Sequence, residues 1–198
     1  MTQHVLASHY DNEEQAYGAS KLGVWLFLVT EILLFGGLFV TYIVYRAVTP
    51  EIFHEGSHHL NRILGAVNTV VLICSSFTMA MAVHKTQHGD RNRANQYLLL
   101  TLFFAACFMI VKYVEYTHKF HEGLLPGTSL FFSLYFMMTG LHGIHVAAGM
   151  GLIAWVLIRS NRGHFGPKYY TPVEMTGIYW HLVDLIWIYL FPLLYLIG

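Results

Sequence analysis

The chain has 198 residues, in which 11 Lys and Arg are balanced by 11 Asp and Glu. Hydrophobic residues make up 56% of it and charged residues only 11%, whereas soluble domains average roughly 25% charged residues. This composition excludes an ordinary water-soluble domain, and the balanced charge leaves no basic face for nucleic acid. Because a bilayer span needs about 20 apolar residues, the chain has room for about five or six spans joined by short loops.

Long apolar runs follow one another along the chain. The first is interrupted by Glu31, and the third carries Lys112 and Glu115 at its end. The runs are continuously apolar rather than alternating every second residue, so they predict helices and not barrel strands. We therefore expect an all-α integral membrane bundle of five transmembrane helices, at about residues 22–45, 63–83, 96–116, 129–158 and 176–197.

The polar segment before the first span, residues 1–21, contains acidic residues and histidines instead of a basic start followed by a short apolar stretch. We therefore expect no cleaved signal peptide and interpret this segment as a cytoplasmic polar tail. Residues 22–198 contain no internal repeat, and their short loops contain glycine and proline. We expect them to form one five-helix transmembrane domain.

Basic residues outside the spans predict the orientation of the chain. The side of the amino terminus carries seven of them, which are Lys21, Lys85, Arg91, Arg93, Arg159, Arg162 and Lys168. The opposite side carries three, which are Arg46, Arg62 and Lys119. By the positive-inside rule, the amino terminus is cytoplasmic and Gly198 faces outward.

Glu31 is a carboxyl group inside the first predicted span, about 14 Å from the start of that span by helical rise. A carboxylate at this depth is costly, so the side chain should face protein, lipid headgroup or water rather than acyl chains. Two interpretations stay open: a protonatable site on a proton or ion path, and a neutral carboxyl hydrogen-bonded to a neighbouring helix. Under both, we expect Glu31 to be buried, largely protonated and reactive toward a hydrophobic carbodiimide.

Histidines and an aspartate occupy the last two spans. His181 and Asp184 stand at i and i+3, so the imidazole and the carboxylate can pair. A structural pair is favoured here over a proton relay or a cofactor ligand. His142 and His145 lie in the middle of the fourth span, beside small residues that allow close helix approach, namely Gly140, Gly143 and Gly149.

Haem binding needs ligands from facing helices, and the intramembrane candidates are His142, His145 and His181. A two-haem cytochrome b would want four, so haem is disfavoured. Cys74 and Cys107 lie singly in apolar runs and fit packing rather than metal binding. The sequence also lacks a phosphate-binding glycine loop and GxSxG. We therefore expect no catalytic residue, no metal ligand and no cofactor-binding residue in this chain.

Four segments, taken in order, resemble subunit III of haem-copper respiratory oxidases, the cytochrome c oxidase subunit III family. They are WLFLVTEILLFGGLF at 25–39, NTVVLICSS at 68–76, TGLHGIHV at 139–146 and YWHLVDLIW at 179–187. The resemblance covers nearly all of the chain from Lys21 onward. Larger members have seven helices, whereas this chain matches only the last five, as do many bacterial oxidases.

The resemblance implies an integral subunit of a terminal oxidase that reduces oxygen to water while its catalytic subunit pumps protons. Members of the family carry no haem or copper themselves; they pack against catalytic subunit I, support proton uptake, protect against inactivation during turnover and bind phospholipid. Glu31 matches the family's carbodiimide-sensitive carboxylate. The resemblance also implies a bacterial cytoplasmic membrane, with other oxidase subunits or a respiratory supercomplex as partners. The family's intramembrane polar positions match His142, His145, His181 and Asp184.

Three alternatives remain beside a cytochrome c oxidase. A quinol oxidase would have the same subunit III, because the electron donor binds to other subunits. A stand-alone proton-coupled transporter would use Glu31, Asp184 and the histidines, and would function as a purified chain. A membrane cytochrome would show a haem spectrum on its own.

Overall fold

The computed structural model describes residues 12–197 of the chain, and these residues are largely helical. Within them, five helical stretches are long and apolar enough to cross a membrane, with the last helix and its terminal turn counted as one. The predicted all-α fold with five spanning helices is therefore confirmed. In chain order the elements are α1 (Glu13–Val48), α2 (Pro50–His58), α3 (Arg62–Gln87), α4 (Arg91–His121), α5 (Leu130–Asn161), α6 (Thr171–Phe191) and the π-helical turn η1 (Pro192–Leu196).

The first helix starts earlier than the first predicted span. It begins at Glu13, where the side chain of Asn12 accepts a hydrogen bond from the backbone N–H of Gln15 at 2.8 Å. Residues 13–21 of the predicted polar tail are therefore helical, while residues 1–11 lie outside the described residues. A helix of 36 residues measures about 54 Å, so α1 must tilt or project from a hydrocarbon core of ~30 Å.

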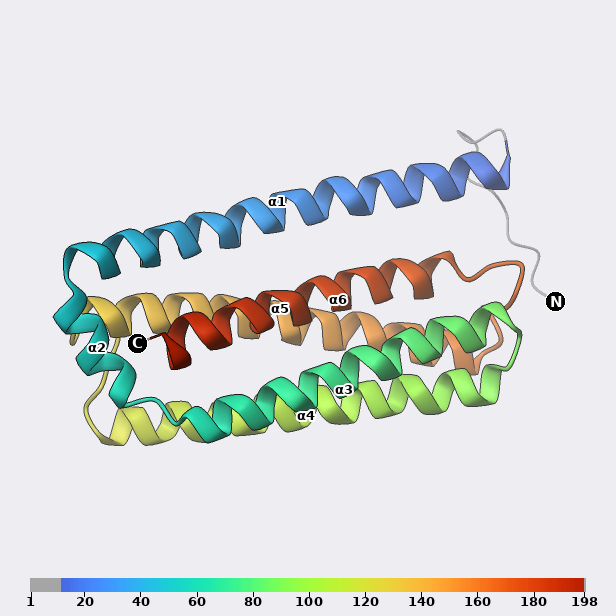
Figure 1. Ribbon diagram of the computed structural model, residues 1–198. Helices are drawn as coiled ribbons and strands as arrows, with labels where there is room; N and C mark the ends of the chain where they lie inside the picture. The colour runs from blue at the N-terminus through green and yellow to red at the C-terminus, as the bar shows by residue number, and fades with distance from the viewer. Residues whose placement is uncertain (1–11, 198) are drawn as a thin grey trace.

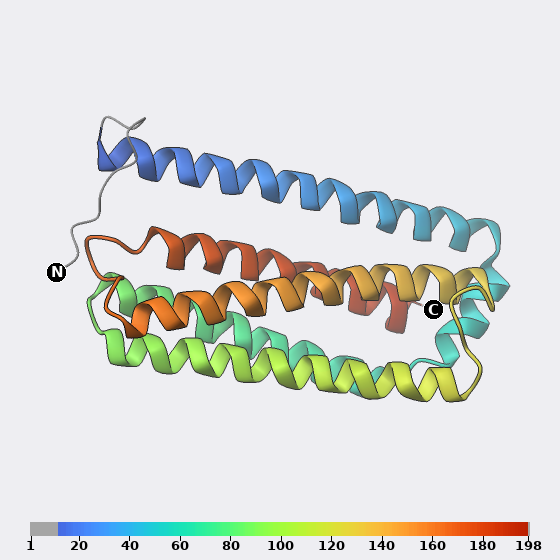
Figure 2. The ribbon, with the colours of Figure 1, turned by 180° about the vertical axis from the view of Figure 1, so that it is seen from behind.

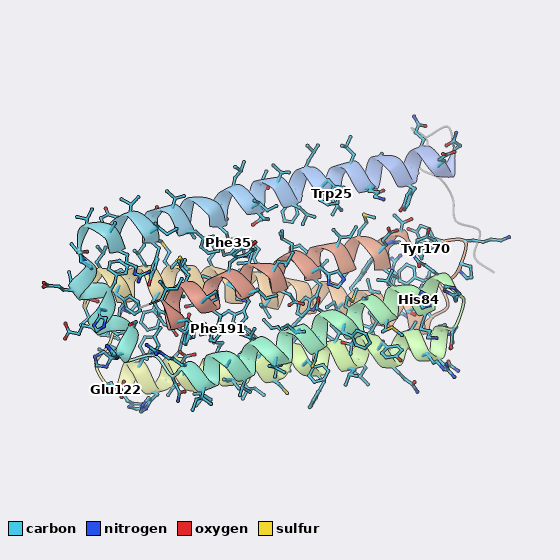
Figure 3. All side chains as sticks on the ribbon, viewed as in Figure 1. Trp25, Phe35, His84, Glu122, Tyr170 and Phe191 are labelled. Atoms are coloured by element: carbon cyan, nitrogen blue, oxygen red, sulfur yellow. The ribbon has the colours of Figure 1, made fainter. Side chains whose placement is uncertain are left out.

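Helices α3 to α6 pack together as a bundle, and α1 lies along the outside of this bundle (Figures 1 and 2). The buried apolar side chains of α1 are Leu28, Phe35 and Tyr42, which repeat every seven residues and form one narrow seam. Figure 3 shows Phe35 on the side of α1 that faces the bundle. Most other apolar side chains of α1 are exposed, as expected for a helix in contact with lipid or with another membrane protein.

The ends of the bundle separate the loops into two groups. The start of α1, the α3–α4 loop and the α5–α6 loop lie at one end, where Figure 3 labels His84 and Tyr170. Glu122 and the carboxyl end of the chain lie at the other. Helices α3 and α5 are followed by Gly89 and Gly163, whose φ angles of 77° and 80° favour glycine. The loops predicted to be basic therefore gather at one end of the bundle.

The orientation of the chain across the membrane stays a prediction. We expect alkaline phosphatase, which needs an oxidising compartment for its disulfides, to be active when fused after the last residue. The same enzyme inserted after Gly89 should be inactive, because that loop belongs to the basic end. The opposite pattern of phosphatase activity would reverse the orientation.

The last spanning helix changes its geometry at Pro192. This residue has no N–H to donate to the carbonyl of Ile188, so the α-helical ladder cannot continue through it. The chain instead forms a π-helical turn, in which the N–H of Ile197 donates to the carbonyl of Pro192 at 3.0 Å. Tyr195 lies in this turn and is fully buried in the bundle.

Glycine allows close helix packing at one position of α5. A Cβ atom on Gly149 would lie 2.7 Å from two ring carbons of Trp180. A Cβ on Gly143 would meet nothing within 4 Å, and one on Gly140 would meet only the hydroxyl of Tyr116, at 3.9 Å. The predicted role in close packing is therefore confirmed for Gly149 and wrong for Gly143, and Gly140 makes only an ordinary contact.

Candidate functional site

A buried ion pair lies between α4, α5 and η1, toward the carboxyl end of the chain. Lys112 Nζ lies 2.9 Å from Glu115 Oε2, and the two side chains are 9% and 5% exposed. Lys112 also donates to the hydroxyl of Tyr195 at 2.8 Å. The other carboxylate oxygen, Glu115 Oε1, accepts from Tyr195 at 2.7 Å and from Tyr135 at 3.0 Å. Both charges are therefore compensated by each other and by two tyrosine hydroxyls.

An aromatic wall surrounds the ammonium group of this pair. Lys112 Nζ lies 4.8 Å from the centroid of the Trp187 ring, a cation–π distance. The indole N–H of Trp187 donates to Thr69 Oγ1 on α3 at 3.1 Å, which fixes the ring. We refer to Lys112, Glu115, Tyr135 and Tyr195 as the buried ion-pair cluster. It joins α4 to α5 and to the terminal turn.

Lys119 lies one helical turn beyond Glu115 and is 2% exposed. Its Nζ donates to the backbone carbonyl of His59 at 3.1 Å, so it ties α4 to the segment after α2. Lys119 is one of the three basic residues predicted to lie outside the spans on the outward side. Lys119 is therefore a buried residue of the bundle and not a solvated loop residue.

Glu31 pairs with a histidine of the fourth spanning helix. Its Oε2 atom lies 2.8 Å from Nε2 of His145, and the two side chains are 12% and 15% exposed. The other ring nitrogen, Nδ1, lies 2.8 Å from the carbonyl of Leu141 and must carry a proton to donate to it. Only one further proton is then needed between Nε2 and Oε2, and with it the pair has no net charge. Because the pair has no net charge, the free-energy cost of burying the Glu31 carboxyl at this depth is reduced. The two side chains can also share or pass a proton.

Aromatic side chains shield the Glu31–His145 pair. The Phe35 ring meets the His145 ring edge-on, with centroids 5.4 Å apart. Tyr179 on α6 donates its hydroxyl to the carbonyl of His145 at 3.1 Å. Three spanning helices, α1, α5 and α6, therefore meet at this pair.

The polar residues of α6 do not pair with each other. His181 Nδ1 lies 2.7 Å from the hydroxyl of Ser76 on α3. Asp184 is 2% exposed, and within residues 12–197 its carboxyl group has the Ser76 hydroxyl as a hydrogen-bonding neighbour, although not at full hydrogen-bond geometry. The predicted His181–Asp184 pair is therefore wrong, because the serine of the adjacent helix takes the imidazole.

His142 is fully buried and belongs to the core. Both of its ring nitrogens lack a hydrogen-bond partner in the part of the chain that the structure describes. Its ring lies 5.6 Å from that of Phe108 and 5.4 Å from that of Trp187. These contacts suit packing in an apolar environment.

The predicted site residues thus occupy three separate places: the Glu31–His145 pair, the core position of His142, and the α3–α6 face with His181 and Asp184. Over residues 12–197, no three or more His, Cys, Asp or Glu side chains lie together as metal ligands would. What the arrangement offers is a proton-sharing pair and a charge-compensated ion pair between helices.

These features define a multi-pass membrane protein whose polar groups lie at the contacts between spanning helices. The chain belongs to the cytochrome c oxidase subunit III family, because the family model described as "Cytochrome c oxidase subunit III" matches residues 7–198. The resemblance noted in the four sequence segments is confirmed.

Relatives of both donor classes are similar to this chain. Cytochrome c oxidase subunit 3 of Synechocystis sp. is 41% identical over 180 residues, which cover 88% of this chain and 74% of the relative. Quinol oxidase subunit 3 of Bacillus spizizenii is 34% identical over 89% of this chain and 86% of its own length. Cytochrome bo(3) ubiquinol oxidase subunit 3 of Pseudomonas putida is also 34% identical, with coverage of 89% and 85%.

The Glu31–His145 contact leads to a prediction for Glu31→Gln. We expect this variant to assemble normally, because a glutamine amide can still donate to Nε2 of His145. It should lose labelling by a hydrophobic carbodiimide, measured by mass spectrometry of the chain. Glu174→Gln is the control: Glu174 accepts from Tyr17 at the basic end, so its replacement should leave the labelling unchanged.

Two results would contradict this prediction. Loss of assembly in Glu31→Gln would mean that the fold requires the ionisable carboxyl. Full labelling of that variant would place the reactive carboxyl elsewhere.

Proposed function

We propose that this chain is a non-catalytic subunit III of a proton-pumping haem-copper terminal oxidase and that it packs directly against the catalytic subunit. The observation that carries the proposal is the match of residues 7–198 to the subunit III family. Haem and copper then belong to partner subunits, and oxygen is reduced there. Phospholipid is the expected ligand of the exposed apolar surface, which is largest on α1.

Cytochrome c is the proposed electron donor, as in the name of the 41% identical relative from Synechocystis. Quinol is the alternative. The bacterial cytoplasmic membrane is the proposed location, with the basic end of the bundle inside.

The proposed contribution to the complex is proton supply and durability. The basic end carries three histidines and cationic side chains, and the cationic groups create a local field there. The groups there are the half-buried Lys85 and the exposed Arg91, Arg93, Arg159, Arg162 and Lys168, with His84, His88 and His164. A partner subunit that takes up protons on this side of the membrane would do so within this field.

Depletion of the subunit from the purified oxidase tests the proposal. We expect the haem spectrum to be unchanged. The initial rate of oxygen consumption should stay near that of the complete oxidase at pH 6.5 and should show a larger deficit at pH 8. Activity should then decline progressively over many turnovers. Immediate loss of all activity with intact haem would instead mean that the subunit takes part in catalysis directly.

A further inference from the structure

A sequence pattern typical of metal binding lies on the short helix α2. Residues 54–58 read HEGSH, which has the spacing HExxH. On a helix, this spacing places two histidines four residues apart on one face, where they can bind a zinc ion together. Residues 54–58 are the last five residues of α2. The helix that the pattern requires is therefore present.

The two faces of α2 have different surroundings. Phe53, Gly56 and Ser57 are buried, and a Cβ atom on Gly56 would overlap the ring of Phe131, so α2 rests directly on α5. The opposite face carries four exposed side chains at i, i+3, i+4 and i+7, which are Glu51, His54, Glu55 and His58. The buried face fixes the helix, while the polar face is open to solvent at the end of the bundle away from the start of α1 (Figure 1).

The imidazole rings of His54 and His58 lie next to each other. Their centroids are 4.6 Å apart and their planes meet at 75°. A metal ion that binds one nitrogen of each ring, at about 2.0–2.1 Å, requires two rings that are neighbours in this way. Because both side chains are exposed, an ion can reach them from solvent.

The charge around the two histidines favours a cation. Both glutamates lie on the same face, and Pro50–His58 contains no lysine or arginine. A second pair with the same spacing, His84 and His88, has ring centroids 4.2 Å apart at the basic end. In that pair Met81 and Lys85 occupy the positions that correspond to the two glutamates. The pair on α2 is therefore the better cation site of the two.

We propose that His54 and His58 bind a divalent transition-metal ion, such as Zn²⁺, at the end of the bundle predicted to face outward. Imidazole nitrogen is a preferred ligand of zinc and copper ions. The structure groups no three His, Cys, Asp or Glu side chains of residues 12–197 as ligands, so water fills the remaining positions and the ion is exchangeable. The site departs from the expectation that this chain has no metal ligand, and it does not depend on the proposed function.

Zinc titration of the full-length chain tests the site. The chain is purified in detergent micelles through a tag without histidine, and Zn²⁺ binding is measured by isothermal titration calorimetry. His54→Ala and His58→Ala should each weaken this binding by at least about tenfold, because each removes one of the two protein ligands. The matched control is His84→Ala/His88→Ala, which should stay within about twofold of the unmodified chain because that pair lies at the opposite end.

A second measurement counts the ligands. In the His84→Ala/His88→Ala chain, one equivalent of Cu²⁺ should show two coordinated imidazoles by pulsed electron paramagnetic resonance, and only one after the further change His58→Ala. Metal-free chains with and without His58→Ala should unfold at the same temperature, because this side chain is exposed.

Three results would overturn the inference. The first is an unchanged Zn²⁺ affinity in His54→Ala and His58→Ala, or an equal loss of affinity in the control. The second is a copper spectrum without two imidazoles. The third is a metal-free His58→Ala chain that unfolds more easily, which would give the histidine a structural role instead.

Discussion

Lys112→Met is expected to destabilise the chain by about 3–5 kcal/mol, because it leaves the Glu115 carboxylate buried without its cation. The two tyrosines of the buried ion-pair cluster compensate only part of that charge, and both already donate to the same oxygen, Oε1. The measurement is the free energy of unfolding of the separated subunit in mixed micelles. The double variant Lys112→Met/Glu115→Leu should lose less stability than the single one, since no unpaired charge remains.

The matched control for this prediction is the exposed pair of Asp90 and Arg93. This pair has the same i, i+3 spacing at the amino-terminal end of the same helix, with Nε and Oδ2 3.4 Å apart, but its side chains are 39% and 66% exposed. Arg93→Met should therefore change the free energy of unfolding by less than about 1 kcal/mol. If Lys112→Met and Arg93→Met lower the free energy of unfolding equally, burial does not determine the strength of the Lys112 contact.

Gly149→Ala is expected to destabilise the chain by about 1–3 kcal/mol through overpacking. The added methyl group would lie 2.7 Å from the Trp180 ring. That ring cannot move away easily, since it is fully buried and its indole N–H donates to Ser75 Oγ at 3.1 Å. Thermal unfolding of the separated subunit measures the effect.

Gly143→Ala is the matched control on the same helix. A Cβ at Gly143 meets nothing within 4 Å, and alanine favours the helix by about 1 kcal/mol over glycine. We therefore expect unchanged or higher stability for this variant. If Gly149→Ala is as stable as Gly143→Ala, the α5–α6 contact is looser than its geometry indicates.

Hydrophobic runs made the five spans predictable, because a helix in lipid must be apolar along its length whatever it packs against. The ends of the helices were harder to predict. The amino-terminal part of α1 is polar, and its helical structure depends on the Asn12 cap and on the contact of Tyr17 with Glu174 on α6. A hydropathy pattern reveals neither the cap nor the contact between the two helices.

The polar contacts between helices were harder to predict than the helices. The i, i+3 spacing of Lys112 and Glu115 was a usable signal, but the pair was placed at a span end, where charges are usually solvated. The same kind of spacing misled at His181 and Asp184, because Ser76 on another helix competes for the imidazole. A local pattern shows which side chains can meet along one helix, and not which neighbours arrive from the others.

The attachment of α1 has a consequence for the order in which the protein is assembled during synthesis. The hydrogen bonds that hold α1 join residues 114 to 157 positions apart, namely His145 with Glu31, Ile197 with Arg46, and Glu174 with Tyr17. The first helix to leave the ribosome can therefore pack early only against α2, as Tyr42 does against Phe53, and it gains its spanning partners once the last spans have been inserted. Until then its apolar surface is available to lipid and insertion factors, and docking of α1 becomes a late step that reports completion of the bundle.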